Sequence, residues 1–142
     1  MSVRATTSAG DSMPLHSSQD VVRARQLVRD RAVAMGFSLV DQTKLVTAAS
    51  ELARNTVDYG RGGTVHIATV DGREGPGIRL TFVDQGPGIP DIELALRDHY
   101  TTGSGLGMGL GGARRLVNEF EIESTVGVGT RITVTKWKRQ SL

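Results

Sequence analysis

Glu51 and Asn55 are two side chains whose types and spacing suit metal binding and proton transfer. They lie four residues apart in a segment with helical periodicity, so both project from one helix face, one turn apart. An amide oxygen can ligate a hard cation such as magnesium. A carboxylate beside that cation can orient or deprotonate a water or a hydroxyl. An ordinary solvated helix face has the same spacing, and the nearby Arg54 and Asp58 fit that simpler interpretation.

A second candidate is the segment 84–90, Asp-Gln-Gly-Pro-Gly-Ile-Pro, which follows an apolar stretch. The carboxylate of Asp84 at a strand end can accept a hydrogen bond from an exocyclic amine, as adenine would offer. Gly86 and Gly88 lack a Cβ and would let the backbone approach a flat ring closely. A tight turn with a turn-favouring aspartate is the alternative.

The third candidate is the glycine run at residues 103–112. Its spacing leaves backbone N–H groups able to face an anion, and it opens a helix whose N-terminus favours phosphate. It is not a P-loop, because no Lys-Ser or Lys-Thr follows, and no strand precedes it as a dinucleotide fingerprint requires. A flexible linker is the alternative, but Leu106, Met108 and Leu110 are too apolar for a solvated linker.

The elements that position these residues follow from hydrophobic periodicity. A 3.6-residue pattern predicts one helix from Ser18, capped by Ser17 or Ser18 and stopped by Gly36, and a second from Ser38 to before Gly60. Alternating patterns predict strands near residues 65–69, 78–83, 121–126 and 130–138, with a short edge strand at 12–17. Shorter helices are expected at residues 91–97 and 109–119.

This order of elements favours an α+β fold, a two-layer sandwich in which helices cover one face of a mixed, mostly antiparallel sheet. We expect a single domain at residues 12–139 after a flexible tail at residues 1–11, which is small, polar and without periodicity. The 142 residues, 38% of them hydrophobic, are sufficient for a core.

Composition excludes several classes of function. With no cysteine there is no disulfide or thiolate metal site, which is compatible with a reducing cytoplasm. No apolar run of about 20 residues suits a membrane, and no secretory signal is visible. A net charge of +2 and 4% aromatic residues argue against nucleic acid. The three histidines lack ligand-like spacing. We expect a solvated strand edge at the basic end, Lys136, Lys138 and Arg139, with a partner-binding role as the alternative.

In this order and spacing, the motifs resemble the Bergerat-type (GHKL) ATP-binding fold of histidine kinases, type II topoisomerases, heat-shock chaperones and anti-sigma serine kinases. Residues 51–55 resemble its N box, Asp84-x-Gly86-x-Gly88 its first glycine box, and residues 103–109 its second. Gly127-x-Gly129-Thr130 resembles its closing motif.

Within that superfamily the chain resembles the RsbT group of anti-sigma regulatory serine/threonine kinases, which belong to the bacterial stressosome. The likeness rests on residues 36–44, 50–55 and 84–91 and on Lys136-Trp137, and it covers roughly residues 12–139. The chain has no room for the dimerisation domain of a histidine kinase or the further domains of a topoisomerase.

The resemblance implies roles for individual residues. Glu51 would be the general base toward a serine or threonine hydroxyl, Asn55 would ligate magnesium, and Asp84 would bind the adenine amine. Backbone amides around Leu106 to Gly109 would hold the phosphates, and the Thr130 hydroxyl would lie near the adenine. The implied nucleotide-binding set is Asn55, Asp84, Gly86, Gly88, Gly103, Gly105, Leu106, Gly107, Met108, Gly109 and Thr130.

The resemblance also implies ATP and Mg²⁺ as cofactors and a STAS-domain antagonist or scaffold protein as substrate. A kinase of this kind switches partners in sigma-factor or stress signalling, and when released it activates a PP2C-like phosphatase. One departure concerns the arginine that some relatives carry just before the second Gly-x-Gly, where Gly105 or Leu106 stands here. A non-catalytic, nucleotide-gated protein-binding module and an ATPase without protein substrate are the alternatives.

Overall fold

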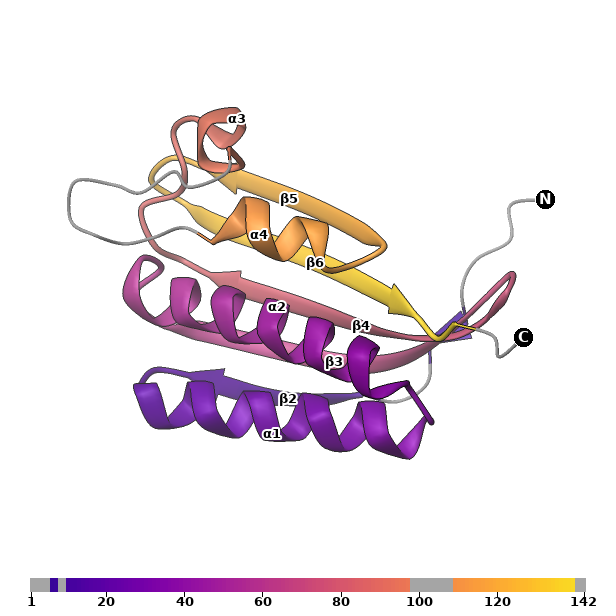
Figure 1. Cartoon of the computed structure of the whole chain (residues 1–142). Helices are drawn as coiled ribbons and strands as arrows, with labels where there is room; N and C mark the ends of the chain where they lie inside the picture. Colours follow the sequence, from indigo (N-terminus) through magenta and orange to yellow (C-terminus); the bar gives the residue numbers. More distant parts are fainter. Residues whose placement is uncertain (1–5, 8–9, 98–108, 140–142) are drawn as a thin grey trace.

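The helices and strands below lie within residues 6–7, 10–97 and 109–139, the part of the chain that the computed structural model describes. Their order alternates hairpins and helices, as Figure 1 shows. The elements are β1 (Thr6–Thr7), β2 (Asp11–Leu15), α1 (Ser18–Ala34), α2 (Leu39–Asp58), β3 (Gly63–Gly72), β4 (Gly75–Asp84), α3 (Ile92–Ala95), α4 (Leu110–Arg115), β5 (Glu119–Thr125) and β6 (Gly129–Trp137).

The two long helices begin where local capping signals predict. The Ser17 hydroxyl accepts a hydrogen bond from the Asp20 N–H at 3.2 Å, and the Ser38 hydroxyl accepts one from the Asp41 N–H at 3.1 Å. Gly36 then takes a left-handed φ of 81° after α1, a conformation that favours glycine. These contacts confirm the predicted starts of α1 and α2. None of the described helices combines the length and the hydropathy needed to cross a bilayer.

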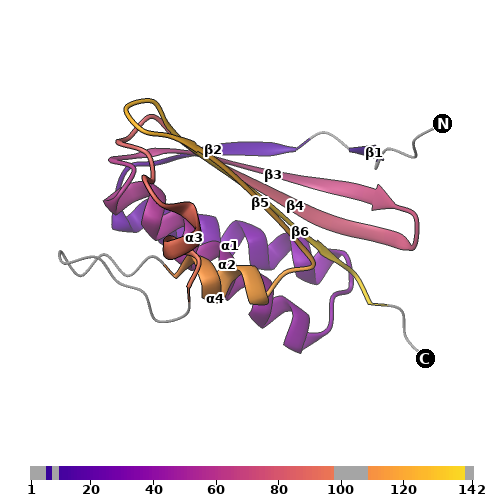
Figure 2. The same ribbon diagram turned by 90° about the horizontal axis from the view of Figure 1, so that it is seen from above.

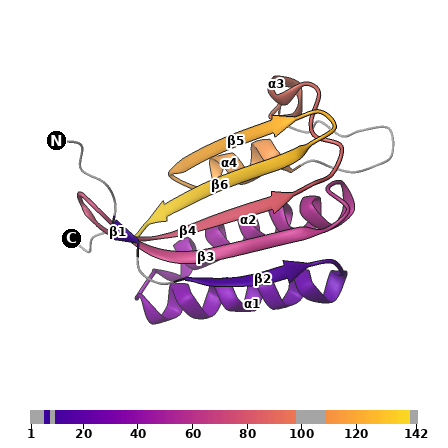
Figure 3. The same cartoon turned by 180° about the vertical axis from the view of Figure 1, so that it is seen from behind.

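The sheet is antiparallel in every pairing of the described residues, with strand order β1-β3-β4-β6-β5 and β2 also paired with β3. Seen edge-on, the helices lie on one side of the sheet only (Figure 2), and the view from behind shows the other face uncovered (Figure 3). The predicted α+β two-layer sandwich is confirmed, and the pairing is simpler than the mixed sheet we expected.

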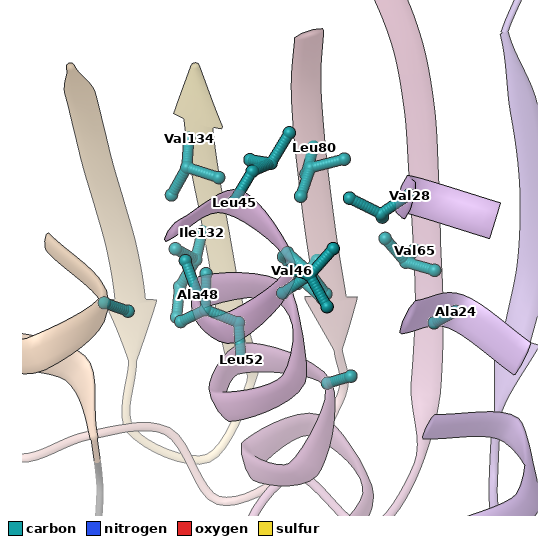
Figure 4. Close-up of a cluster of buried hydrophobic side chains, with 14 of the residues drawn as sticks. Ala24, Val28, Leu45, Val46, Ala48, Leu52, Val65, Leu80, Ile132 and Val134 are labelled. Carbon is teal, nitrogen blue, oxygen red and sulfur yellow. The ribbon is translucent and has the colours of Figure 1, made fainter. Parts of the chain in front are cut away.

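The core lies between α1, α2 and the inner face of the sheet. Leu45, Ala48 and Leu52 of α2 are fully buried and face strand residues such as Leu80 and Val134 (Figure 4). Burial of a leucine-sized side chain contributes roughly 1.5–3 kcal/mol. This packing fixes α2 against the sheet, and with it the helix face that carries the candidate base.

Some predicted bounds differ from the structure. The β3–β4 hairpin continues to Gly72 and Gly75, through residues that we expected to form a longer turn. Helix α4 ends at Arg115 rather than near residue 119, where β5 begins. Thr6 and Thr7 pair with β3, although they lie in the segment expected to be a flexible tail.

Both outer strands of the sheet carry residues unsuited to further pairing. On β5, the exposed Glu119, Glu121 and Glu123 alternate with partly buried side chains. On β2, Pro14 stands in the middle of the strand, opposite Thr64. Proline has no N–H to donate to a neighbouring strand.

The expectation of a solvated basic end is wrong for Lys136. Its residue exposure is only 6%, and its Nζ lies 3.6 Å from Asp41 Oδ1 and donates to the Leu116 carbonyl at 3.3 Å. Asp41, 1% exposed, also accepts hydrogen bonds from Arg139 Nε at 2.9 Å and Nη2 at 2.7 Å. The chain end is therefore fastened to the first turn of α2.

Charge and burial act differently on the two ends of this contact. The hydrogen bonds from Arg139 hold the pKa of the Asp41 carboxyl below its usual range, against the opposing effect of burial. Burial lowers the pKa of the Lys136 ammonium, and the nearby Asp41 offsets this only in part.

Candidate nucleotide-binding site

A pocket opens beside the C-terminal part of α2, where β4 ends and β6 begins. Polar groups of Asn55, Asp84 and Thr130 line it together with apolar side chains of Phe82 and Ile132. The remaining lining residues are Thr56, Tyr59, Ile89 and Leu110. A largely apolar pocket with a few fixed polar groups is the usual form of a small-molecule site.

The Asp84 side chain is held at the end of β4. Its Oδ1 accepts a hydrogen bond from the Gly86 N–H at 2.9 Å. Gly60 lies against the same carboxylate so closely that a Cβ on Gly60 would collide with Oδ2. Within the described residues Oδ2 accepts no hydrogen bond, which leaves it available to a donor in the pocket.

The first glycine loop is fastened to the last turn of α2. The Tyr59 hydroxyl donates to the Gly88 carbonyl at 2.9 Å. Gly88 has a φ of 78°, and a Cβ there would collide with the Thr125 carbonyl. Glycine is therefore required at this position both by conformation and by space.

The same loop is fastened to the β5–β6 turn. The Ser124 hydroxyl accepts from the Ile89 N–H at 2.7 Å, and the Pro87 carbonyl accepts from the Gly127 N–H at 2.9 Å. Ser124 also shares a 2.7 Å hydrogen bond with the Thr130 hydroxyl, which faces the pocket. One wall of the pocket is thus a hydrogen-bonded unit of three segments far apart in the sequence.

Glu51 lies one turn before Asn55 on α2 and is partly buried. Its carboxylate contacts Gly109, the residue before α4, at which a Cβ would collide with it. Gly109 has a φ of 55°, a left-handed conformation. Gly109, the last residue of the second glycine box, therefore lies directly beside the candidate base Glu51.

The fold places the predicted residues unequally. Asn55, Asp84 and Thr130 line one pocket, Gly86 and Gly88 shape its loop, and Glu51 and Gly109 meet one turn away. The other members of the second glycine box lie outside the described residues, as does the position of the absent arginine. These members are Gly103, Gly105, Leu106, Gly107 and Met108.

Two site residues were missed by sequence reasoning. Tyr59 supports the Gly88 loop and Ser124 supports both Ile89 and Thr130. Tyr59 follows Asn55 by four residues, so helical spacing placed it on the same face, and this signal could have identified it. Ser124 had no comparable signal, because its role depends on contacts across the sheet.

Magnesium fits the oxygen donors on α2. The Asn55 amide oxygen is a hard ligand with the Glu51 carboxylate one turn away, and Mg²⁺ usually takes one or two protein ligands together with phosphate oxygens and water. In the described residues no three His, Cys, Asp or Glu side chains gather into a metal cluster. The described residues thus form no protein-only metal cage, whereas the Asn55 amide oxygen fits a metal site shared with nucleotide phosphates.

Comparison with known proteins shows the family to which the sequence is similar. The family model of histidine kinase-, DNA gyrase B- and HSP90-like ATPases matches residues 40–140. The chain is 47% identical over 120 residues to the serine/threonine-protein kinase RsbT of Bacillus subtilis, covering 84% of this chain and 90% of that protein. It is 32% identical over 127 residues to the anti-sigma F factor of Thermoanaerobacter sp. (strain X514), covering 87% and 89%.

A solved structure shows the same fold. The RsbU and RsbW domains of a Mycobacterium tuberculosis protein superpose with a TM-score of 0.62 at 22% identity, over 94% of this chain and 34% of that one. The likeness spans the whole sandwich, but the matched protein is much longer than this chain.

Proposed function

This chain belongs to the histidine kinase-, DNA gyrase B- and HSP90-like ATPase family, as a serine/threonine-protein kinase of the RsbT type. On that premise we propose that it transfers the γ-phosphate of Mg-ATP to a serine or threonine of a STAS-domain protein, with Glu51 as base. The observation that carries this proposal is the convergence of Asp84, Asn55 and Thr130 on one pocket, with Glu51 one turn along α2.

Adenine binds in the pocket beside Asp84. With Oδ1 committed to the Gly86 N–H, Oδ2 accepts the hydrogen bond from the exocyclic amine. The apolar walls, including Phe82 and Ile132, cover the faces of the ring. The Thr130 hydroxyl, held by Ser124, supplies a second polar contact in the same pocket.

Phosphate transfer takes place at the Glu51 end of the site. A substrate hydroxyl oxygen forms the new bond to the γ-phosphorus, the bond to the bridging oxygen of ADP breaks, and Glu51 takes the hydroxyl proton. Magnesium, when bound, would supply positive charge that stabilises the phosphate oxygens. Asn55 contributes its amide oxygen to the metal, and the contact of Gly109 with Glu51 orients the carboxylate.

The protein partners follow from the type of kinase. Our proposal is that a STAS-domain antagonist or scaffold protein is the substrate and that a PP2C-like phosphatase is the alternative partner, released or captured according to phosphorylation. Names of the relatives, a serine/threonine-protein kinase and an anti-sigma factor, support a regulatory role of this kind.

A nucleotide-gated binding module is the second candidate function. The observation that favours it is the absence of an arginine before the second glycine box. A transition-state charge contact of that kind is a large catalytic term, so its loss favours binding over turnover.

The decisive experiment measures transfer of radiolabelled γ-phosphate to a STAS-domain protein whose gene neighbours the gene of this protein. Wild type is compared with Glu51→Gln and with the matched control Glu121→Gln, which changes an exposed glutamate on β5. We expect transfer by wild type and control, and at least a hundredfold loss in Glu51→Gln with ADP affinity unchanged. No transfer by any of them, with intact ADP binding, would favour the binding module.

A further inference from the structure

A second pocket lies at the other end of α2, away from the nucleotide site. Four cationic side chains from four segments line it: Lys44 of α2, Arg115 of α4, Lys136 of β6 and Arg139 beyond β6. Trp137 completes one wall of the pocket. Its main-chain N–H donates a 2.8 Å hydrogen bond to the side-chain oxygen of Asn118. We call this the cationic pocket.

The charge of the cationic pocket is poorly balanced by the protein itself. Among the described residues, the acidic partner of Lys136 and Arg139 is Asp41, whose carboxylate lies 3.6 Å from Lys136 and 2.7 Å from Arg139. Asp41 is buried behind them, and its carboxylate oxygens are occupied by these bonds. Within the described residues, Lys44, Lys136 and Arg139 carry three positive charges against this one carboxylate, which leaves a formal excess of positive charge in the pocket.

Among these cations, burial and neighbouring positive charge act most strongly against the charged form of Lys136. Its side chain is 8% exposed, its pKa is lowered first by burial, and Lys44 and Arg139 add further repulsion. A carboxylate placed in the pocket would oppose both effects, because attraction between unit charges is strong where water is partly excluded. The pocket is therefore arranged to gain from an anionic ligand.

Two exposed apolar side chains lie on the first turn of α2, the helix that supplies Lys44 to the cationic pocket. Leu39 is 72% exposed and Val40 is 58% exposed, and the two are adjacent in the sequence. Val40 and Lys44 are four residues apart, so they share one face of the helix. Cationic and apolar contacts are thus available to one ligand.

We propose that the cationic pocket and the adjoining Leu39 and Val40 dock an acidic segment of a partner protein. Its aspartate or glutamate carboxylates bind the pocket cations, and an aliphatic side chain covers Leu39 and Val40. A protein segment fits better than nucleic acid, because the charge is gathered in one concavity beside apolar residues and the net charge of the chain is only +2.

This docking site is separate from the proposed kinase chemistry. Lys44 and Asn55 are eleven residues apart on α2, which corresponds to about 16 Å along the helix. A segment bound at one end leaves the nucleotide pocket open, so a partner can be held while nucleotide exchanges. The site does not rest on the proposed transfer reaction and can be tested without it.

Trp137 provides a direct reporter, because it is the single tryptophan of the chain and lines the cationic pocket. The probe is a peptide of alternating Glu-Glu-Leu units without aromatic residues, titrated against the whole chain at low salt while tryptophan fluorescence is followed. We expect a saturable change that weakens with added salt. The matching Gln-Gln-Leu peptide should bind at least tenfold more weakly.

Variants then assign the binding to the pocket. Lys44→Glu should weaken the acidic peptide at least tenfold, whereas Arg25→Glu, the same charge change on exposed α1, should alter it less than twofold. The double variant Leu39→Ser with Val40→Ser should weaken it several-fold. ADP affinity should be unchanged in all three, which shows that each remains folded.

Three outcomes would overturn the docking site. One is equal binding of the glutamine peptide, and another is an equal loss in Lys44→Glu and Arg25→Glu, which would indicate only net charge. The third is competition by inorganic phosphate at the same concentration as the peptide, together with no effect of the Leu39 and Val40 changes. That result would indicate a simple anion site rather than a protein-docking surface.

Discussion

The hydroxyl of Tyr59 donates a 2.9 Å hydrogen bond to the carbonyl of Gly88 and so joins the C-terminal cap of α2 to the first glycine loop. Tyr59 lines the candidate nucleotide pocket and Gly88 belongs to the loop beside it, although 29 positions separate the two residues in sequence. Because Asn55 and Tyr59 share one helix face, the packing of α2 also sets the position of this loop.

Removing that hydroxyl tests its role. Tyr59→Phe should lower ADP affinity about fivefold and the free energy of unfolding by about 1 kcal/mol, the usual contribution of one hydrogen bond. Calorimetric titration and urea unfolding measure the two effects. As a control, Thr43→Ala removes a hydroxyl bonded to Leu39 at the far end of α2 and should leave ADP affinity unchanged. Unaltered affinity in Tyr59→Phe would mean that the loop position does not depend on this bond.

Asp84→Asn should weaken ATP binding at least tenfold. The Gly86 N–H needs an acceptor, so the new amide oxygen turns toward it and the amide NH₂ faces the pocket. Two donors then oppose each other where adenine presents its amine. Titration with ATP and GTP checks this reasoning, since the variant should lose its preference for the adenine nucleotide. Retention of that preference would remove Asp84 from base recognition.

Two glycines near α4 offer a matched comparison. Gly109→Ala places a Cβ against Glu51 in a left-handed backbone, so we expect phosphate transfer to fall at least tenfold. Gly112 has open space around it inside α4, and Gly112→Ala should leave transfer intact and raise stability by about 1 kcal/mol. Equal effects of the two changes on transfer would contradict the role given to Gly109.

Asp41 should be important for stability. Asp41→Ala leaves Lys136 buried without its carboxylate and frees the chain end, so the free energy of unfolding should fall by about 2–3 kcal/mol. Asp30→Ala, which removes an exposed partner of Gln26, should cost less than about 0.5 kcal/mol. Chemical unfolding of the two variants at neutral pH provides the comparison. A small loss for Asp41→Ala would show that Arg139 and Lys136 are adequately solvated without it.

Acid should weaken the fold partly through the same carboxyl. Because the folded-state pKa of Asp41 is lowered, its contribution is fully present above the ordinary value of 3.8 and is lost as pH falls through the lowered value. Unfolding midpoints measured between about pH 5 and pH 2 should therefore decline less steeply in Asp41→Asn. Some slope should remain, because the His16 N–H also lowers the pKa of Asp20. An identical slope in wild type and variant would exclude Asp41 as a source.

The sequence predicts the helices better than the site. Helices α1 and α2 are set by local signals, the apolar stripe and the Ser17 and Ser38 caps, and both began where expected. The contact of Gly109 with Glu51 depends on how α4 packs beside α2, which no local pattern contains. Motif order therefore predicted residues that the fold brings to one pocket, whereas the contacts that hold this pocket came only from the fold.

Lys136 shows a signal that was present but not used. Ile132 and Val134 alternate with outward residues on β6, and the same period of two places Lys136 on the inner face with them. Its charge suggested solvent instead. The partner that makes burial possible, Asp41, is 95 positions away, and sequence spacing alone does not relate such distant residues.

The two outer strands have a consequence for the behaviour of the chain in concentrated solution. A second copy that added its β5 alongside this one would bring Glu119, Glu121 and Glu123 near like charges, and a strand added to β2 would meet Pro14, which lacks a donor. Fibril-like growth by strand addition is thus opposed by charge at one edge and by a missing hydrogen bond at the other. Replacing these glutamates with valine should lower the solubility of the protein, so that it precipitates as its concentration rises.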